Sequence, residues 1–510
     1  PTPFIVFKVQ RILRSLEKQG KLLKSEYASL YPPGAVAPSM YGSIKAHKPE
    51  KNFPMRMIVS TLHTASYTLA MYLTQLIQPT LNKNKIRIKK TESFVSEAKL
   101  WEIDSMEIQV SFDVQNLYPS IPISKSIKVV MQLLSNDKES TARSKLTKAD
   151  IEKLLELCLS TNYYRWGEEI RIANNNSGPI GLSLMVVMAE AYLQNLEEKA
   201  LLEAANNNVI VKSYRRYVDD SHARFTSIQE AEKFKVILNR QDPNIIYTME
   251  MESEQGQLNF LDVTIINSRL GHYLFKIYRK PAITNVQIKP NSCVDPRVAK
   301  ATFLGFLSRA EKLCSYQFIQ DEVDFLLDNF TENGHKRSEL EVIVNKRKYR
   351  QPHFKDSHQE KQHEQQPIAV LPWIPGISPK LRKQFRKSGV KAVFRSHPNL
   401  KMLLTYANKP NLPRNSIPGV YEVQCSCGKK YVGETSLKAS TRLNQHKKDV
   451  FAGNWCDSGL SEHARTCPGQ IDWASARVIK CDKQKFSRKV RESLEIQYRK
   501  TGPASDTGTN

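Results

Sequence analysis

A strict alternation of apolar and polar side chains runs through residues 106–113. The apolar positions are Met106, Ile108, Val110 and Phe112. Because successive side chains of a β-strand point to opposite faces, this period of two predicts a half-buried strand. The strand would carry Asp113 at its end, on the polar face.

A second short pattern surrounds the sequence Tyr217-Val218-Asp219-Asp220. Apolar and β-favouring residues lead up to it and resume at Ala223 and Phe225. This arrangement predicts a hairpin with two carboxylates at its tip. Residues 258–265 have the composition of a further strand, in which we interpret Asp262 as a structural residue.

Apolar residues at helical spacing predict several helices. These lie within residues 1–35, 62–80 (closed by Pro79), 147–159 (with Thr147 as N-cap), a long segment after the glycine-containing turn 177–183, 303–313 and 322–330. A hairpin is expected at 161–172.

Polar and basic segments separate these elements. A basic, glycine-containing loop at 41–49 runs into a predicted strand at 55–60, an arrangement suited to gripping a triphosphate. Residues 346–366 are polar and low in complexity, which indicates a linker. A basic connector follows from 371 to about 414.

The composition limits the class of partner. A chain of 510 residues predicts about two to four domains. The formal net charge of +25 favours binding to a polyanion through counterion release. The sequence has neither a long basic amphipathic helix nor 18 consecutive apolar residues, so we expect nucleic acid and not a membrane as the partner. Because the chain begins at Pro1, we expect it to be a fragment of a longer protein.

The two carboxylates at the hairpin tip are chemically informative. Adjacent ionised carboxylates repel each other, so stability alone gives no reason to place them there. If the hairpin and the strand at 106–113 share a sheet, Asp113 would join Asp219 and Asp220. Three carboxylates could hold two Mg²⁺ ions for an in-line phosphoryl displacement.

The segments 111–120 and 216–220 resemble motifs A and C of reverse transcriptases, with the Penelope-like retroelements, relatives of telomerase reverse transcriptase, as the most similar branch. The resemblance implies fingers and palm at 1–280 and a helical thumb at 281–345, followed by the linker and connector at 346–414. It also implies that Tyr118 is a steric gate against ribonucleotides and that Arg56 contacts the triphosphate. The complete set implied to bind the nucleotide is Lys45, Arg56, Val114, Tyr118 and Gly181.

Residues 415–510 carry a second group of reactive side chains. Tyr421 and Tyr431 lie on two short predicted strands, and Arg442 and His446 share one helix face at i, i+4. Glu492 lies on a later helix, with Glu495 as its rival. These residue types suit phosphodiester hydrolysis: Arg442 can stabilise developing charge and Glu492 can hold a Mg²⁺ ion. The set resembles a GIY-YIG endonuclease, as fused to the reverse transcriptase in Penelope-like elements.

The cysteine distribution predicts a metal site in this last segment. Five of the eight cysteines lie within the last 86 residues, which indicates metal ligation in a reducing compartment. Cys425 and Cys427 sit in one tight turn, and His463 and Cys467 have H-x₃-C spacing, so these four could form a structural Zn²⁺ site. Cys456 competes for the fourth position, and free buried cysteines are the other reading. Penelope-like nucleases resemble this arrangement, with a Cys-Cys-His-His set. In this sequence Gly469 stands at the position expected for the second histidine, so Cys467 would replace it from two residues earlier.

The sequence therefore predicts a multidomain α+β protein: a right-hand polymerase followed by a small α/β nuclease at 415–510. We expect an RNA-directed DNA polymerase and endonuclease that nicks target DNA and copies element RNA by target-primed reverse transcription. Its partners would be template RNA, target DNA with a primer 3′ end, and dNTPs, in the nucleus after cytoplasmic synthesis. The alternatives are a telomerase-like or maturase-like reverse transcriptase with a vestigial nuclease, and an inactivated copy that only binds nucleic acid.

Overall fold

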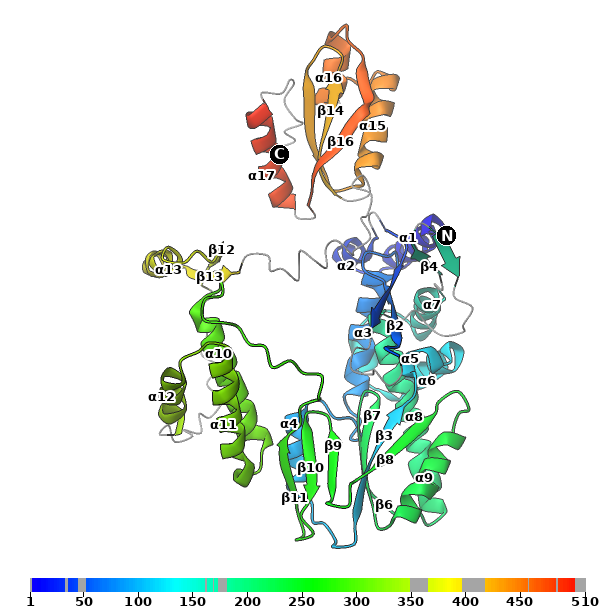
Figure 1. Cartoon of the computed structure of the whole chain (residues 1–510). Helices are drawn as coiled ribbons and strands as arrows, with labels where there is room; N and C mark the ends of the chain where they lie inside the picture. The colour runs from blue at the N-terminus through cyan, green and yellow to red at the C-terminus, as the bar shows by residue number, and fades with distance from the viewer. Residues whose placement is uncertain are drawn as a thin grey trace.

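The computed structural model in Figure 1 shows a mixed α/β protein with several units. Its buried apolar side chains form four separate clusters within the described part of the chain. Among those residues, none of the helices combines the length and apolar composition needed to cross a lipid bilayer. The described residues are 2–32, 35–44, 52–160, 163–167, 169–172, 181–348, 366–396, 418–456, 458–482 and 485–499.

The central element is a four-stranded antiparallel sheet in the order β6-β7-β3-β8. It confirms both the strand predicted at 106–113 and the predicted hairpin, although the strand begins two residues later because Met106 is exposed in the preceding turn. The four strands are β3 (Ile108–Val114), β6 (Val211–Tyr217), β7 (Asp220–Phe225) and β8 (Tyr247–Met251).

Helices cover the first face of this sheet. Val110, Phe112 and Phe225 on that face are fully buried in the largest core cluster. The long helix predicted after residue 183 is confirmed and lies at the centre of this cluster. The packed helices are α6 (Ile123–Asn136), α7 (Lys148–Leu159), α8 (Ser183–Asn206) and α9 (Ile228–Arg240).

A second sheet, in the order β11-β10-β9, lies beside the other face (Figure 1). Gln109 is completely buried there, and its amide donates to the carbonyl oxygens of Gly256 and Ile265. The expectation of a half-buried strand is therefore wrong near Gln109, because both faces are covered until the strand reaches the exposed Asp113. The second sheet consists of β9 (Gln257–Phe260), β10 (Val263–Asn267) and β11 (Tyr273–Ile277), and α4 (Thr91–Ala98) packs in its core.

The single strand expected at 258–265 is wrong, because the chain reverses inside that run. Leu261 has a φ of +55°, so the turn at Leu261 and Asp262 joins β9 to β10 as an antiparallel hairpin. Asp262 accepts a hydrogen bond from Thr91 and forms an ion pair with Arg309 at 2.8 Å. These contacts suit the structural role expected for this carboxylate.

The N-terminal part contains a four-stranded sheet in the order β2-β1-β4-β5 and confirms the helices expected there. The loop predicted from residue 41 is wrong up to Ile44, since these residues pair with the 55–60 strand; residues 45–51 lie outside the described part. Pro79 lies inside its helix, because in the last turn its missing N–H costs only one hydrogen bond. The elements are α1 (Thr2–Lys18), α2 (Lys24–Leu30), β1 (Ser39–Ile44), β2 (Met55–Ser60), α3 (Tyr67–Leu81), α5 (Leu117–Ser120), η2 (Ser140–Ala142), β4 (Tyr163–Trp166) and β5 (Glu169–Ile172).

Three helices follow the second sheet and enclose a core of their own. They are α10 (Pro296–Leu313), α11 (Tyr316–Glu332) and α12 (Arg337–Lys348), which confirms the helices expected at 303–313 and 322–330. The connector expected from 371 onwards is partly folded. Two parallel strands and a helix form a β-α-β unit: β12 (Ile368–Pro372), α13 (Ser378–Lys387) and β13 (Lys391–Arg395).

The C-terminal unit is a three-stranded antiparallel sheet in the order β15-β14-β16, with helices α15 and α17 beside it (Figure 1). The first two strands confirm the short strands predicted around the Cys-Ser-Cys-Gly turn. The elements are β14 (Gly419–Cys425), β15 (Lys430–Thr435), α15 (Ala439–Ala452), α16 (Gly459–Thr466), β16 (Ile471–Cys481) and α17 (Lys485–Arg499).

Candidate functional site

The strand pairing brings the three predicted carboxylates to one end of the central sheet. Asp113 of β3 stands directly opposite Asp220, the first residue of β7. Residues opposite each other on antiparallel strands project from the same face. The turn that carries Asp219 is tied to the end of β3, because the Val114 amide donates to the Asp219 carbonyl oxygen at 3.3 Å.

The electrostatics of this end favour a bound cation. Loss of water around the carboxylate, followed by the negative charges of Asp219 and Asp113, raises the pKa of Asp220 to about 6. The nearby Lys280 offsets only part of this effect. The three carboxylates lack the tight convergence of a preformed cage: of the described residues, only one Cys/His cluster brings three or more ligand atoms within 4.8 Å of one another.

Tyr118 lies next to the carboxylates. It is half-buried on α5 and packs against the main core. Burial and then the charges of Asp219 and Glu190 raise the pKa of its phenol, which places the ring beside the hairpin. The Val114 side chain is buried and its backbone amide already donates to the Asp219 carbonyl oxygen, so neither group is open to a ligand.

The other residues implied to bind a nucleotide occupy different surroundings. Gly181 has a φ of +106°, and a Cβ there would stand 2.2 Å from the carbonyl oxygen of Val59, so glycine is needed for close approach to β2. The Thr61 hydroxyl donates to the Gly181 carbonyl at 3.1 Å. Arg56 is exposed on β2, and Lys45 lies outside the described residues.

Polar residues beyond the hairpin have a structural explanation. His222 is fully buried, and burial followed by the charges of Arg224 and Arg215 lowers its pKa to about 3, which keeps it neutral. Arg224 forms an ion pair with Glu107 and lies over the Trp101 ring. A face that is covered by a second sheet accommodates these side chains, and the sequence pattern alone does not reveal that covering sheet.

The C-terminal unit gathers the second predicted set. Tyr421 is buried, and its hydroxyl lies 2.7 Å from His446 Nε2. Burial raises the Tyr421 pKa to about 12, while Arg442 and Tyr431 act in the opposite direction and Glu492 adds to it. The other four predicted residues therefore lie around the Tyr421 phenol.

Glycine is required where the two tyrosines meet. A Cβ on Gly433 would stand 2.7 Å from the Tyr421 hydroxyl and 2.9 Å from the Tyr431 ring. Real Cβ contacts are not this short, so only glycine lets β15 lie under both rings.

His446 has a partner that sequence reasoning missed. Its Nδ1 lies 3.0 Å from the hydroxyl of Ser458, which also caps α16 by accepting from the Ser461 amide. Burial followed by the charge of Arg442 lowers the His446 pKa to about 4, so the ring is neutral. If the proton is on Nδ1, this nitrogen donates a hydrogen bond to the Ser458 hydroxyl, and Nε2 accepts a hydrogen bond from the Tyr421 hydroxyl. The signal available in the sequence was a serine at a helix N-cap.

The two candidate glutamates on α17 have different environments. The Glu492 carboxylate accepts from the Glu434 amide at 2.8 Å and contributes to the charge around Tyr421. Glu495 is buried and forms an ion pair with Arg491 at 2.8 Å. Glu492 is thus the glutamate that lies beside the tyrosines.

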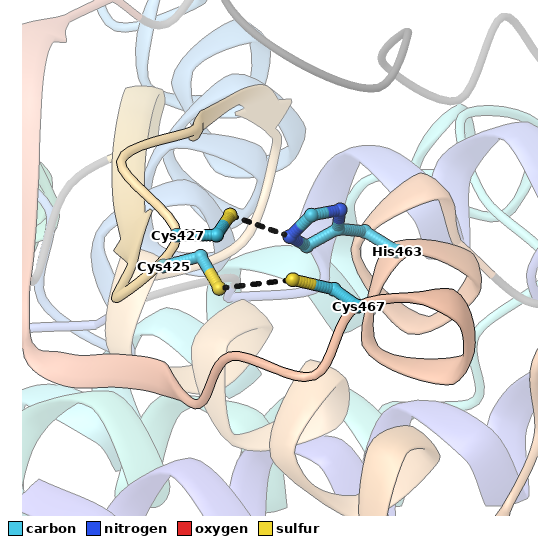
Figure 2. A group of neighbouring side chains, drawn as sticks. All are labelled: Cys425, Cys427, His463 and Cys467. Atoms are coloured by element: carbon cyan, nitrogen blue, oxygen red, sulfur yellow. Dashed lines mark hydrogen bonds between the residues drawn. The ribbon is translucent and has the colours of Figure 1, made fainter.

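Figure 2 shows the Cys/His cluster, in which the turn after β14 faces α16. Cys425 Sγ lies 3.9 Å from Cys467 Sγ, and Cys427 Sγ lies 3.5 Å from His463 Nε2. All four ligand atoms lie within 4.8 Å of one another. Three thiols and an imidazole at these separations fit a tetrahedral Zn²⁺, although other soft divalent metals use the same ligands.

The geometry also separates the rival positions for the fourth ligand. Cys456 is exposed and stands outside the cluster. Gly469 lies next to the cluster. A Cβ at Gly469 would stand 3.1 Å from Cys425 Sγ, and the Gly469 amide donates to Cys467 Sγ. Cys467, two residues earlier, occupies the position that completes the set.

Comparisons with known proteins give distant structural likenesses. No protein-family model matches the chain, and no curated protein matches it. A telomerase structure from Candida albicans, in complex with a TWJ fragment of telomeric RNA, aligns at 9% identity and a TM-score of 0.42, over 61% of this chain and 57% of that one. Apo telomerase from Candida tropicalis, truncated from its C-terminal domain, aligns at 14% and 0.36, over 48% and 56%.

A viral enzyme gives a likeness of similar strength. The BmCPV RNA-dependent RNA polymerase at its elongation state aligns at 11% identity and a TM-score of 0.39, over 61% of this chain and 27% of that one. The chain thus spans a little more than half the length of the two telomerase chains. With TM-scores below 0.5, none of these likenesses carries a conclusion about function.

Proposed function

We propose that the chain is a template-directed nucleotidyltransferase, an RNA-directed DNA polymerase, whose reaction centre is formed by Asp113, Asp219 and Asp220. The observation that carries the proposal is the register of the central sheet, which sets Asp113 opposite Asp220 beside the hairpin tip. In this proposal residues 1–280 are fingers and palm, and 281–345 form the thumb.

The carboxylates fit divalent cations on chemical grounds. Mg²⁺ prefers hard oxygen ligands. The raised pKa of Asp220 reflects loss of water around its charge and, after that, the negative charges of Asp219 and Asp113, which a cation would neutralise. Bound Mg²⁺ would lower the pKa of the attacking 3′-hydroxyl and neutralise charge on the transferring phosphoryl group. Asp113 and Asp220 would hold the cations from two strands, while Tyr118 would close the space needed by a ribose 2′-hydroxyl.

Primer extension tests the proposal directly. With an RNA template, a DNA primer, dNTPs and Mg²⁺, the wild-type chain should extend the primer. Asp219→Asn should bind the same template–primer but extend it at least about 100-fold more slowly, because it loses a metal ligand. Extension unaffected by Asp219→Asn would refute the assignment, and a wild-type chain that binds without extending would favour the inactivated copy.

We further propose that residues 415–510 form a nuclease. The Tyr421–His446 contact of 2.7 Å supports this second function. His446 Nε2 would take the phenolic proton, so that the Tyr421 oxygen could accept a proton from an attacking water. Arg442 would stabilise the phenolate and the negative charge that develops on the phosphoryl oxygens. Glu492 would hold a divalent cation, which on binding supplies electrostatic stabilisation of the leaving oxygen.

A nicking assay separates the two functions. Nicking of supercoiled DNA should fail in Arg442→Ala and Glu492→Gln, whereas Asp219→Asn should nick normally. A wild-type chain that extends primers but does not nick would favour the telomerase-like or maturase-like alternative, in which the nuclease is vestigial. Nicking that persists in both Arg442→Ala and Glu492→Gln would refute the assignment of these residues. If both activities are present, the chain could nick target DNA and extend the new 3′ end on element RNA in the nucleus.

The Cys/His cluster would hold a structural zinc ion in this proposal. Cys425 ends β14 and Cys427 lies in the turn that follows it, whereas His463 lies on α16 and Cys467 caps the C-terminal end of that helix. Zinc would join these segments in a small unit whose apolar core is limited.

A further inference from the structure

Arg216 is a buried cation three residues before Asp219. Its side chain is almost completely inaccessible, although it lies on a strand that leads to the hairpin tip. One guanidinium nitrogen, Nη1, donates to the carbonyl oxygen of Val218 at 3.0 Å. Val218 has a φ of +58°, a conformation that β-branched residues rarely adopt. The bond therefore acts on the strained residue immediately before the two carboxylates.

A charge-balanced network fixes this guanidinium. Its Nε lies 2.8 Å from the carboxylate of Glu197, and Nη1 lies 3.2 Å from Glu190; both glutamates come from α8. Arg87 pairs with the same Glu190 at 3.1 Å. The Tyr214 hydroxyl donates to Glu197 at 3.0 Å. Two arginines thus meet two glutamates inside the protein.

Stability is a weak explanation for such a network. Replacing a buried ion pair by apolar residues of similar volume is often neutral or stabilising, because the charges lose their hydration. What apolar residues cannot supply is an oriented donor for a particular carbonyl group. The Arg216 main chain is also fixed, because its amide donates to Ile86 and its carbonyl accepts from the Ile88 amide.

We propose that Arg216, fixed by Glu190 and Glu197, is a positioning residue that holds the Val218–Asp219 turn in the conformation required for divalent-cation binding by the three carboxylates. It touches no substrate in this role. The inference rests on the proposed polymerase function and adds a residue to its site.

A charge-balanced double substitution tests the inference. Arg216→Met with Glu197→Leu removes one positive and one negative charge, and it leaves the Arg87–Glu190 pair in place. The matched control is Arg224→Met with Glu107→Leu, a second buried arginine–glutamate pair in the same sheet. Arg224 lies opposite Gln109, away from the hairpin tip.

A second variant guards against a failure to fold. Arg216→Lys keeps the positive charge, but its donors all lie on one nitrogen, which cannot occupy the positions of both Nε beside Glu197 and Nη1 beside the Val218 carbonyl. Circular dichroism and thermal melting establish that each variant is folded before function is measured.

The first measurement is Mn²⁺ binding to the full chain without nucleic acid, monitored by electron paramagnetic resonance. The part of the wild-type signal that is lost in Asp220→Asn identifies the site. The Kd of that site should rise about tenfold or more in both Arg216 variants. Extension at saturating template–primer should fall about 100-fold. The control pair should keep the wild-type Kd and rate.

Either of two results would overturn the inference: folded Arg216 variants with the wild-type Mn²⁺ affinity, or an equal loss in the control pair. Failure of the proposed polymerase function gives a different result. The wild-type chain would then extend no primer, while Mn²⁺ binding would still show whether Arg216 affects the affinity of the hairpin carboxylates for the cation.

Discussion

Replacing Asp220 by asparagine should stabilise the protein and abolish the proposed DNA synthesis. In the folded chain the pKa of Asp220 is raised from its ordinary 3.8 to about 6. A carboxylate with a raised pKa destabilises the folded state at pH values where it is ionised. Asparagine has nearly the same shape and carries no charge, so it removes the cost of desolvating a carboxylate and also the repulsion with Asp219 and Asp113.

The size of the effect follows from this difference. About two pKa units correspond to about 3 kcal/mol at 1.36 kcal/mol each. Although part of its hydration is lost, the Asp220 side chain still contacts solvent, and screening reduces this to about 1 kcal/mol. For a cooperative folding unit of about 150–250 residues, this free energy corresponds to an increase in melting temperature of roughly 2–4 °C.

The stabilisation by Asp220→Asn should increase with pH. The penalty is fully present above pH 6, it shrinks as the pH falls towards 3.8, and it is absent below that value. Differential scanning calorimetry at pH 7.5 and pH 4.5 should therefore show a larger gain at the higher pH. Added Mg²⁺ should raise the melting temperature of wild type but not of Asp220→Asn.

The matched control is Asp321→Asn, which removes an exposed carboxylate on α11. It should leave both the melting temperature and its Mg²⁺ response unchanged. A loss of stability in Asp220→Asn at pH 7.5, or a gain of equal size at both pH values, would refute the electrostatic reasoning.

Three further substitutions probe the remaining sites. Gly433→Ala places a methyl group against the Tyr421 hydroxyl, so it should cost about 1–3 kcal/mol of stability in the C-terminal unit and eliminate nicking while primer extension persists. Cys425→Ser should release zinc, as measured by elemental analysis of the purified full chain, whereas Cys456→Ser should retain it; the opposite pattern would reassign the ligands. Tyr118→Val should let the polymerase incorporate ribonucleotides more readily, and unchanged discrimination in single-nucleotide incorporation would remove the steric-gate role.

The sequence predicts best where local pattern and chemistry coincide. The period-two strand that ends at Asp113 and the hairpin at Asp219 were predictable because both signals are local. The turn at Leu261 was missed because the positive φ is adopted by a leucine and not by the glycine or asparagine that usually marks such a turn in a sequence. The β-α-β unit at 368–395 was missed because its elements are short and its helix is strongly basic.

Long-range partners account for the rest of what was missed. Arg216 depends on two glutamates that come from a helix and not from its own sheet, and no spacing rule connects them. Ser458 could be recognised as a helix cap, but its contact with His446 depends on how two helices pack. The sequence therefore indicates reactive groups more readily than the residues that orient them.

Helix α16 connects the Cys/His cluster with the tyrosine site. Ser458, which caps the helix, contacts His446, and the same short helix carries His463 and ends beside Cys467. If the C-terminal unit is a nuclease, as proposed above, this helix would make the tyrosine site depend on the Cys/His cluster: displacement of His463 or Cys467 at one end of α16 would displace Ser458 at the other end and, with it, the partner of the His446 ring.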